Sequence, residues 1–507
     1  MKQLCSFCTM VAPGALLIAL SAPLGTVLWA QTIPVQLWIT TSSTTGVTVG
    51  LKQQPDLRFV PDADDRAAAI DIDDSKTFQK MEGGGASFTD GAAWLMNEKL
   101  SPTVRDQVMQ QLFDPKAGIG LSFLRNPMGA SDLTRTEYTY DDDASDKADP
   151  SLPHFSIAHD LTDILPLTKM ARRLNPSLRL MMVPWSPPAW MKDNNSLVHG
   201  DILPQFYPHL TNYFLKTMQA YQAQGVPIDY VAINNEPTCC PEIDYPSANL
   251  PASEQITILK DYWFPIWEKN HIQTAIFLLD FNWCNNGLVA PLLQDNAIRT
   301  SPFVAGVAYH GYCGSPTVQS DNHNTFGAEA FFTERTGSIK NNPAVQHDKD
   351  MNLMIGVFRN WGRTFVKWPV AADETQGPHL GGCGTCTGLI TVHTSDNPGK
   401  VEYGIEYYAM GHYTKFVPVG ASRIDSTASD NVPNVAFKNP DGSLALIAYN
   451  NTTEPQSFKV RWHSRVFRYT LPVNTSATFR WSGTPASAGM HTGSAHEKTA
   501  IGGQEIQ

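Results

Sequence analysis

Short apolar runs that are typical of β-strands alternate with amphipathic helical stretches through most of this 507-residue chain. Strands that alternate with helices form a parallel sheet, because each helix returns the chain to the edge where the next strand begins. Eight such units predict a closed (β/α)8 TIM barrel. The eight predicted strands are 79–84, 121–126, 178–184, 228–234, 274–280, 304–310, 329–334 and 363–370.

An open, doubly wound sheet is the alternative arrangement of these elements. It favours a glycine-rich phosphate-binding turn, and Gly83-Gly84-Gly85 lacks the spacing of that turn. Asp160 and Ser253 are predicted N-caps, because each short polar side chain precedes a helical pattern. The predicted helices include 101–113, 160–174, 205–224, 253–269 and 348–361.

Both ends of the chain have β character. Residues 35–40 alternate apolar and polar side chains, and after Gly420 the helical patterns give way to short strands and a turn at 439–442. A half-sheet at either end would expose an edge, so we expect one β-sandwich built from both ends. The predicted organisation is a signal peptide at 1–30, N-terminal sandwich strands at 31–78, the barrel at 79–415, C-terminal sandwich strands at 416–482 and a disordered tail at 483–507.

The first thirty residues resemble a secretory signal. Lys2 precedes an apolar run at 10–22, and a plausible cleavage point follows Ala30. A buried amphipathic start is the alternative interpretation. We therefore expect a secreted or periplasmic protein without stable membrane insertion. The net charge of −11 argues against nucleic acid as a partner.

Six cysteines lie outside the predicted signal, at positions 239, 240, 284, 313, 383 and 386. Cys383 and Cys386 have the spacing of a redox or zinc pair, but no second pair or histidine pair accompanies them. We expect a loop disulfide or free thiols there. Because no cluster has metal-ligand spacing, we expect neither a metal nor an organic cofactor.

Polar and aromatic residues follow the predicted barrel strands where those strands end. Carboxyl ends of barrel strands meet at one rim, which is where TIM-barrel enzymes carry their active sites. The fourth strand shows this clearly, because it stops at Asn235-Glu236-Pro237 and proline cannot continue a central strand. The residues expected at this rim include Asp90, Arg125, Trp185, Asn235, Glu236, His310, Tyr312, Glu334 and Trp368.

Two carboxylates among tryptophans suit the hydrolysis of a glycosidic bond. One carboxylic acid protonates the leaving oxygen, and a second carboxylate attacks the anomeric carbon or activates water. The acid needs a raised pKa, which burial or a neighbouring carboxylate provides, and an arginine such as Arg125 keeps the other group ionised. Tryptophan faces stack on the apolar faces of sugar rings.

Several motifs, in this order, resemble glycoside hydrolase family 30, the group of glucosylceramidases and endo-β-1,6-glucanases. They span most of residues 78–420. The motifs are Phe78-Gln79-Lys80-Met81-Glu82-Gly83-Gly84-Gly85-Ala86-Ser87-Phe88-Thr89-Asp90, Leu124-Arg125-Asn126-Pro127-Met128, Pro184-Trp185-Ser186-Pro187-Pro188-Ala189-Trp190, Asn235-Glu236-Pro237, Tyr309-His310-Gly311-Tyr312, Phe332-Thr333-Glu334-Arg335 and Gly411-His412-Tyr413-Thr414-Lys415-Phe416.

The resemblance implies a barrel joined to a β-sandwich and a retaining mechanism. By position, Glu236 would be the acid/base and Glu334 the nucleophile, and Asn235 would hold the sugar 2-hydroxyl. The remaining matches are Asp90, Trp185 and Trp368 at sugar-binding positions and Arg125, His310 and Tyr312 around the nucleophile.

Glu374 is a competing nucleophile, because it also follows a strand. Glu334 is favoured, since it follows the His310 motif by one βα unit. Two positions depart from the family, Gly311 and the segment 238–241, and both bear on the outer part of the site.

The sequence therefore predicts a retaining β-glycosidase that acts on a β-linked glucoside, either a glucosylceramidase-like β-glucosidase or a β-1,6-glucanase. Its partner would be a carbohydrate or a glycolipid. The alternatives are β-xylosidase, β-fucosidase or xylanase activity on the same scaffold, and a catalytically inactive carbohydrate-binding protein.

Overall fold

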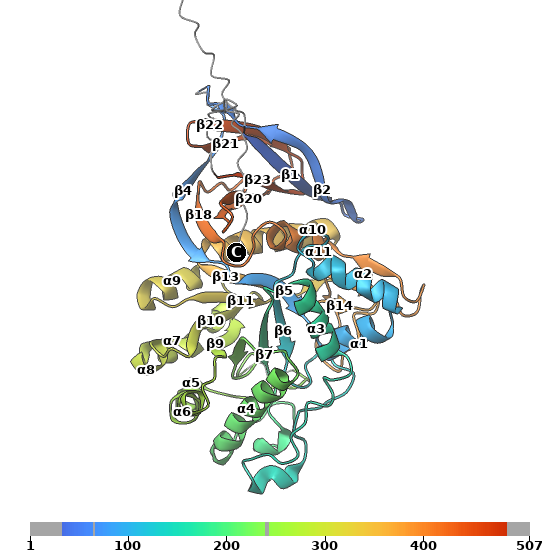
Figure 1. Cartoon of the computed structure of the whole chain (residues 1–507), viewed down its shortest axis with the longest axis vertical. Coiled ribbons are helices and arrows are strands. Elements are labelled where there is room, and N and C mark those ends of the chain that lie inside the picture. Colours follow the sequence, from blue (N-terminus) through green and yellow to red (C-terminus); the bar gives the residue numbers. More distant parts are fainter. Residues whose placement is uncertain (1–32, 64–65, 239–242, 484–507) are drawn as a thin grey trace, which may run out of the picture. The chain divides into compact units, whose positions relative to one another are not determined.

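A computed structural model of the chain describes residues 33–63, 66–238 and 243–483 (Figure 1). Eight parallel strands close into a barrel in sequence order, with the last strand pairing with the first. This confirms the predicted (β/α)8 barrel. The barrel strands are β5 (Gly83–Ser87), β6 (Phe123–Pro127), β7 (Arg179–Val183), β8 (Tyr230–Ala232), β9 (Ala275–Asn282), β10 (Val304–His310), β11 (Ala330–Glu334) and β13 (Gly362–Pro369).

Helices lie outside the ring of strands (Figure 1). They are α1 (Asp90–Glu98), α2 (Pro102–Phe113), α3 (Ile164–Leu174), α4 (Tyr207–Ala223), α5 (Ala252–Thr257), α6 (Phe264–Lys269), α7 (Asn286–Gln294), α8 (Asn296–Arg299), α9 (Thr317–Phe326), α10 (Pro343–Arg359) and α11 (Ile405–Thr414). Among the described residues, no helix is both long and apolar enough to cross a membrane.

Apolar side chains from the strands fill the barrel. Phe123, Met181, Phe277, Phe331 and Val366 belong to one buried cluster, to which seven of the eight barrel strands contribute residues. Their alternate neighbours face the helices in a second, larger cluster. Side chains of one strand point alternately inward and outward, so a run that is apolar throughout is buried on both faces.

The first barrel strand differs from its predicted position. Residues up to Lys80 belong to a sandwich strand, and β5 begins only at Gly83. A Cβ atom on Gly85 would lie 1.8 Å from the backbone oxygen of Phe123 on β6, so only glycine permits this approach. The glycines also remove the side-chain periodicity from which a strand is predicted.

Both predicted N-caps were wrong. Helix α3 begins at Ile164, and Asp160 is instead buried, where its carboxylate accepts hydrogen bonds from Tyr138, Tyr140 and Tyr221. The helix predicted to begin after Ser253 is preceded by Pro251 and has a π-helical segment at Ile258–Trp263 in its middle.

A ten-stranded sheet combines strands from both ends of the chain, as predicted. Strand β1 pairs with β23, and β4 lies between β18 and β21. The two halves of the sheet contribute to one apolar cluster, so they pack face to face as a sandwich. Its strands are β1 (Pro34–Ser42), β2 (Val47–Arg58), β3 (Val60–Pro61), β4 (Ala69–Lys80), β18 (Ser422–Ser426), β19 (Asn434–Lys438), β20 (Ser443–Tyr449), β21 (Gln456–Trp462), β22 (Arg465–Leu471) and β23 (Thr475–Ser482).

Short strands and, within the described residues, two disulfides shape the loops beyond the barrel strands. The disulfides join Cys284 to Cys313 and Cys383 to Cys386, so the CxxC pair is a loop disulfide. The predicted signal peptide, Cys239, Cys240 and most of the predicted tail lie outside the described residues. The short strands are β12 (Gly337–Ser338), β14 (Ala371–Ala372), β15 (Cys386–Thr387), β16 (Ile390–Val392) and β17 (Val401–Tyr403).

Candidate active site

A cavity of about 680 Å³ opens at the carboxyl ends of the barrel strands. This volume is within the range of small-molecule sites. Six of the nine predicted site residues line it: Trp185, Asn235, Glu236, Tyr312, Glu334 and Trp368. Arg125 and His310 lie behind that lining, where both are fully buried, and they contact its carboxylates.

Glu236 and Glu334 face each other across this cavity. Glu334 is the last residue of β11, and Glu236 follows β8 by four residues. One oxygen of each carboxyl group and a ring nitrogen of His310 all lie within 4.8 Å of one another. Carboxyl groups about 5–5.5 Å apart are typical of retaining glycosidases, and a wider gap of roughly 6.5–9.5 Å is typical of inverting ones.

Both oxygens of Glu334 accept hydrogen bonds. Arg125 donates from Nη1 to Oε2 at 2.7 Å, and the hydroxyl of Tyr312 donates to Oε1 at 2.7 Å. Arg125 also donates from Nη2 to the side chains of Asn235 at 2.6 Å and Asp280 at 2.7 Å. These contacts fix the orientation of the Glu334 carboxylate.

Glu236 is held in a strained backbone conformation. Its φ is +44°, a left-handed value that is uncommon for a residue other than glycine. Its backbone N–H donates to the carbonyl of Asp280, and its Oε1 lies 2.9 Å from Nδ1 of His310. Burial raises the pKa of the Glu236 carboxyl, His310 acts against that shift, and the negative charge of Glu334 adds to it.

His310 connects this acid to a buried aspartate. Burial alone would lower the pKa of the imidazole, but the charges of Glu334 and Asp280 raise it to about 9. The ring is therefore an imidazolium at neutral pH, and its Nε2 lies 3.2 Å from Asp280. Burial raises the pKa of the Asp280 carboxyl, but the positive charges of Arg125 and His310 outweigh burial and keep that pKa well below the usual range.

Asp280 is a residue that the sequence reasoning missed. It is fully buried, and it accepts hydrogen bonds from Arg125, His310 and Thr333. Its position in the sequence could have identified it, because Asp280 is the last residue of the fifth predicted strand and follows an apolar run. A carboxylate that ends a buried strand requires a partner, and here the partners are two cations.

Two tryptophans form one wall of the cavity. The rings of Trp185 and Trp368 stack with centroids 4.8 Å apart and an interplanar angle of 26°. The guanidinium carbon of Arg125 lies 4.9 Å from the first ring centroid and 5.5 Å from the second. The aromatic wall and the charged network are thus parts of one packed unit.

Asp90 does not line the cavity. Its carboxylate pairs with Arg135 at 2.7 Å and with His159 at 2.9 Å. Asp132 lines the cavity instead, and it comes from the loop after β6. Burial and the charge of Glu334 raise the pKa of Asp132 to about 7. One of its oxygens has no hydrogen-bond partner among the described residues.

Glu374, the competing nucleophile, is not among the described residues that line the cavity. Its carboxylate accepts hydrogen bonds from the backbone N–H groups of Thr394 and Ser395. The Ser395 bonds keep the pKa of this carboxyl well below its usual range. Glu374 therefore anchors a loop.

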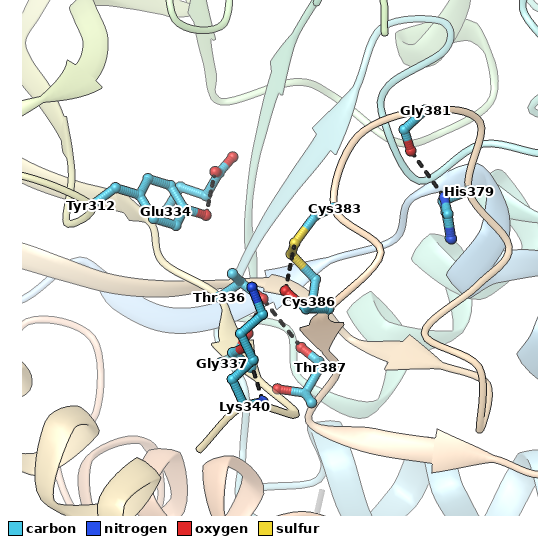
Figure 2. Close-up of a disulfide and its surroundings, with 12 residues drawn as sticks. Tyr312, Glu334, Thr336, Gly337, Lys340, His379, Gly381, Cys383, Cys386 and Thr387 are labelled. Carbon is cyan, nitrogen blue, oxygen red and sulfur yellow. Dashed lines mark hydrogen bonds between the residues drawn. A yellow bond between two sulfur atoms is a disulfide. The ribbon is translucent and has the colours of Figure 1, made fainter. Parts of the chain in front are cut away.

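Both disulfides line the outer part of the cavity. Figure 2 shows the Cys383–Cys386 bridge together with the hydrogen bond between Tyr312 and Glu334. Strands β12 and β15 pair antiparallel, which joins the segment after Glu334 to the disulfide loop. At Gly311, a Cβ atom would lie 2.8 Å from the ring of Phe332, so any side chain at this position would require that ring to move.

A pair of carboxylates in the mouth of a (β/α)8 barrel, beside a tryptophan wall, is the arrangement of a glycoside hydrolase. The glycosyl hydrolase family 30 TIM-barrel domain matches residues 81–417, and the β-sandwich domain of the same family matches residues 420–479. The chain belongs to glycoside hydrolase family 30.

Relatives within this family differ in their substrates. The chain is 30% identical to endo-1,6-beta-D-glucanase BGN16.3 of Trichoderma harzianum, over 75% of this chain and 80% of that protein. It is 26% identical to the lysosomal acid glucosylceramidase of Mus musculus, over 76% and 78% of the two chains. The solved structure of the endo-beta1,6-glucanase BT3312 superposes with a TM-score of 0.79 at 27% identity and covers 89% of this chain and 99% of its own.

Proposed function

We propose that this protein is a retaining endo-β-1,6-glucanase in which Glu334 is the nucleophile and Glu236 is the acid/base. The proposal rests on the proximity of the two carboxyl groups, whose facing oxygens lie within 4.8 Å. Its substrate comes from similarity, since three fungal relatives at 28–30% identity carry the name endo-1,6-beta-D-glucanase.

In the first step, an oxygen of Glu334 attacks the anomeric carbon and the bond to the leaving sugar breaks. Glu236 gives its proton to the leaving oxygen, and a glycosyl-enzyme ester forms. Burial keeps the Glu236 carboxyl protonated to a higher pH than a free glutamate. His310 occupies one oxygen of Glu236, which leaves the other to carry the proton to the substrate.

In the second step, Glu236 acts as a base. It takes a proton from water, whose oxygen attacks the anomeric carbon and displaces Glu334 as a carboxylate. The covalent bond removes the negative charge of Glu334, and with it one cause of the raised pKa of Glu236. The pKa of Glu236 is therefore higher before the first step, when it must donate a proton, than in the glycosyl-enzyme, when it must be ionised to act as a base.

The remaining cavity residues position the sugar. The faces of Trp185 and Trp368 provide a stacking surface, and Asn235 binds the 2-hydroxyl. The contact that Asn235 and Glu334 both make with Arg125 supports this role of Asn235. We assign to Asp132 the hydroxyl-binding role that was expected of Asp90, because Asp132 lines the cavity and one of its buried oxygens has no hydrogen-bond partner among the described residues.

Hydrolysis of a panel of β-1,6-, β-1,3- and β-1,4-glucans and of glucosylceramide tests the substrate. We expect β-1,6-linked oligosaccharides of several lengths early in the reaction. Release of glucose alone would contradict endo action, and a strong preference for glucosylceramide would favour the activity of the mouse relative.

Two glutamate variants test the chemistry. We expect Glu334→Gln to lower kcat by at least about 1,000-fold, which corresponds to ~4 kcal/mol. Glu374→Gln is the matched control and should retain the parent rate, because its carboxylate bonds to a loop outside the cavity. Loss of activity in the control together with a folded, active Glu334→Gln protein would reverse the assignment.

The protein is further proposed to be exported, with cleavage after Ala30. Mass spectrometry of the protein recovered from the culture medium or periplasm would give the mature N-terminus. An N-terminus at Met1 in the cytoplasmic fraction would contradict export.

A further inference from the structure

A second cavity of about 380 Å³ lies outside the barrel strands, along helices α2 and α11 and strand β2. We call it the tyrosine cleft. Its volume falls within the range of small-ligand sites. The residues that line it are Gly50, Leu51, Gln111, Ala117, Gly118, Ile119, Tyr403, Tyr407, Tyr408 and Lys415.

Three tyrosines make the cleft aromatic. The rings of Tyr403 and Tyr407 have centroids 4.6 Å apart, and those of Tyr407 and Tyr408 have centroids 5.2 Å apart at 86°. The Tyr407 hydroxyl donates to the backbone oxygen of Gln111. Tyr403 and Tyr408 are half-buried. No hydrogen bond of their hydroxyls is found within the described part of the chain, so both remain available to a ligand.

Strand β2 has an irregular backbone beside one of these rings, because its pairing with β1 shifts register around Gly50 and Leu51. Leu51 has a φ of +40°, and its N–H donates to the hydroxyl of Thr40 at 2.9 Å. A Cβ atom on Gly50 would lie 2.4 Å from the ring of Tyr408, so the absence of a side chain there makes room for the tyrosine. The cleft is therefore preformed by the local backbone.

The described lining of the cleft has no acidic residue, and its one cation is already bound. Nζ of Lys415 donates to the backbone oxygens of Lys116 at 3.0 Å and Gly118 at 2.7 Å. For a phosphate or an acidic peptide, these residues offer a single lysine, and two of its three N–H groups already donate to backbone oxygens. Aromatic faces with hydroxyl and amide groups instead suit a neutral ligand that has both an apolar face and hydroxyl groups.

We propose that the tyrosine cleft is a second binding site for a neutral β-glucan chain, separate from the catalytic cavity. A hexose ring has an apolar C–H face that stacks on tyrosine and hydroxyl groups at its edge. The inference rests on the proposed glucanase function, because only a polymeric substrate can occupy the cleft and the catalytic cavity together. Binding there raises the effective concentration of enzyme on its polymer.

Adsorption to immobilised glucan tests this site. Tyr403→Ala/Tyr408→Ala is compared with the parent on beads carrying β-1,6-, β-1,3- or β-1,4-glucan, with Glu334→Gln in both proteins to prevent hydrolysis. We expect about a tenfold or greater rise in the dissociation constant. Tyr262→Ala, a half-buried tyrosine on the barrel exterior outside this cleft, is the matched control and should bind like the parent.

The active double variant should hydrolyse an aryl β-glucoside within about twofold of the parent rate, because its catalytic cavity is intact. Gly50→Ala, which displaces Tyr408 without removing it, should weaken adsorption in the same direction. The proposed site is refuted if the parent and the double variant adsorb equally to every glucan. It is also refuted if the parent adsorbs to none of them. Tyrosine-dependent adsorption without hydrolysis of β-1,6-glucan supports the site and refutes the proposed function.

Discussion

Replacement of Asp280 by asparagine removes one negative charge from the centre of the catalytic network and changes the side-chain volume little. The aspartate is fully buried between Arg125 at 2.7 Å and His310 at 3.2 Å. In the variant, both cations lose this counterion, while Glu334 keeps its own bond to Arg125. We expect Asp280→Asn to destabilise the fold and to lower the pKa of His310.

The magnitude follows from the two contacts. Removing one partner of a buried ion pair costs about 3–5 kcal/mol. His310 has a pKa of about 9 against an ordinary value near 6.5, a difference worth ~3 kcal/mol, to which Glu334 and Asp280 both contribute. We therefore expect the free energy of unfolding to fall by about 3–5 kcal/mol at pH 6.

The pH dependence has a definite sign. Because the pKa of His310 is raised by folding, its contribution to stability is complete below pH ~6.5 and is lost as the pH rises through about 9. The variant has less of this contribution to lose. The difference in unfolding free energy between parent and variant should therefore shrink between pH 6 and pH 9.5.

Urea unfolding at a series of pH values measures this difference directly. Asp106→Asn is a matched control, since that aspartate pairs with Arg105 at the surface and the pair should contribute less than about 1 kcal/mol. A loss below ~1 kcal/mol for Asp280→Asn, or a difference that does not change with pH, would refute the electrostatic coupling of Asp280 to His310.

Two other buried carboxylate sites give further predictions. Asp132→Asn should raise KM for the glucan about tenfold with a smaller change in kcat, because a hydrogen bond between its carboxyl group and a sugar hydroxyl is lost. Steady-state kinetics would show an unchanged KM if Asp132 does not contact the sugar. Lys367→Met should lower the free energy of unfolding by about 3–5 kcal/mol, because Nζ of Lys367 lies 2.6 Å from Asp350 and 2.7 Å from Glu406 in the core. Denaturant titration checks this, and a variant as stable as the parent would show that the two acids are protonated or hydrated without the lysine.

Residues directly at the ends of barrel strands were predictable from the sequence. Parallel strands bring their carboxyl ends to one rim, so Glu236, Tyr312 and Glu334 could be placed together without knowledge of the loops. Trp185 and Trp368 followed from the same rule. The closed barrel and the sheet built from both chain ends were predictable because side-chain periodicity distinguishes strands from helices.

Loop residues were not predictable in the same way. Asp132 lies five residues beyond the end of β6, where no periodicity indicates its direction. Asp90 follows its strand closely, but Arg135 and His159 reach it from the loop after β6 and occupy its carboxylate. Whether Asp90 or Asp132 faces the cavity depends on residues that are distant in the sequence. The local sequence pattern around each aspartate contains no information about those residues.

The identity of the nucleophile is the central claim, and covalent labelling tests it most directly. A 2-deoxy-2-fluoro-β-glucoside with a good leaving group should trap the glycosyl-enzyme, because the fluorine disfavours the positively charged transition state of its hydrolysis. Mass spectrometry of the digested protein should find one sugar on the peptide that contains Glu334, and Glu334→Gln should remain unlabelled. A label on Glu374 or Glu236, with Glu334 unmodified, would contradict the account.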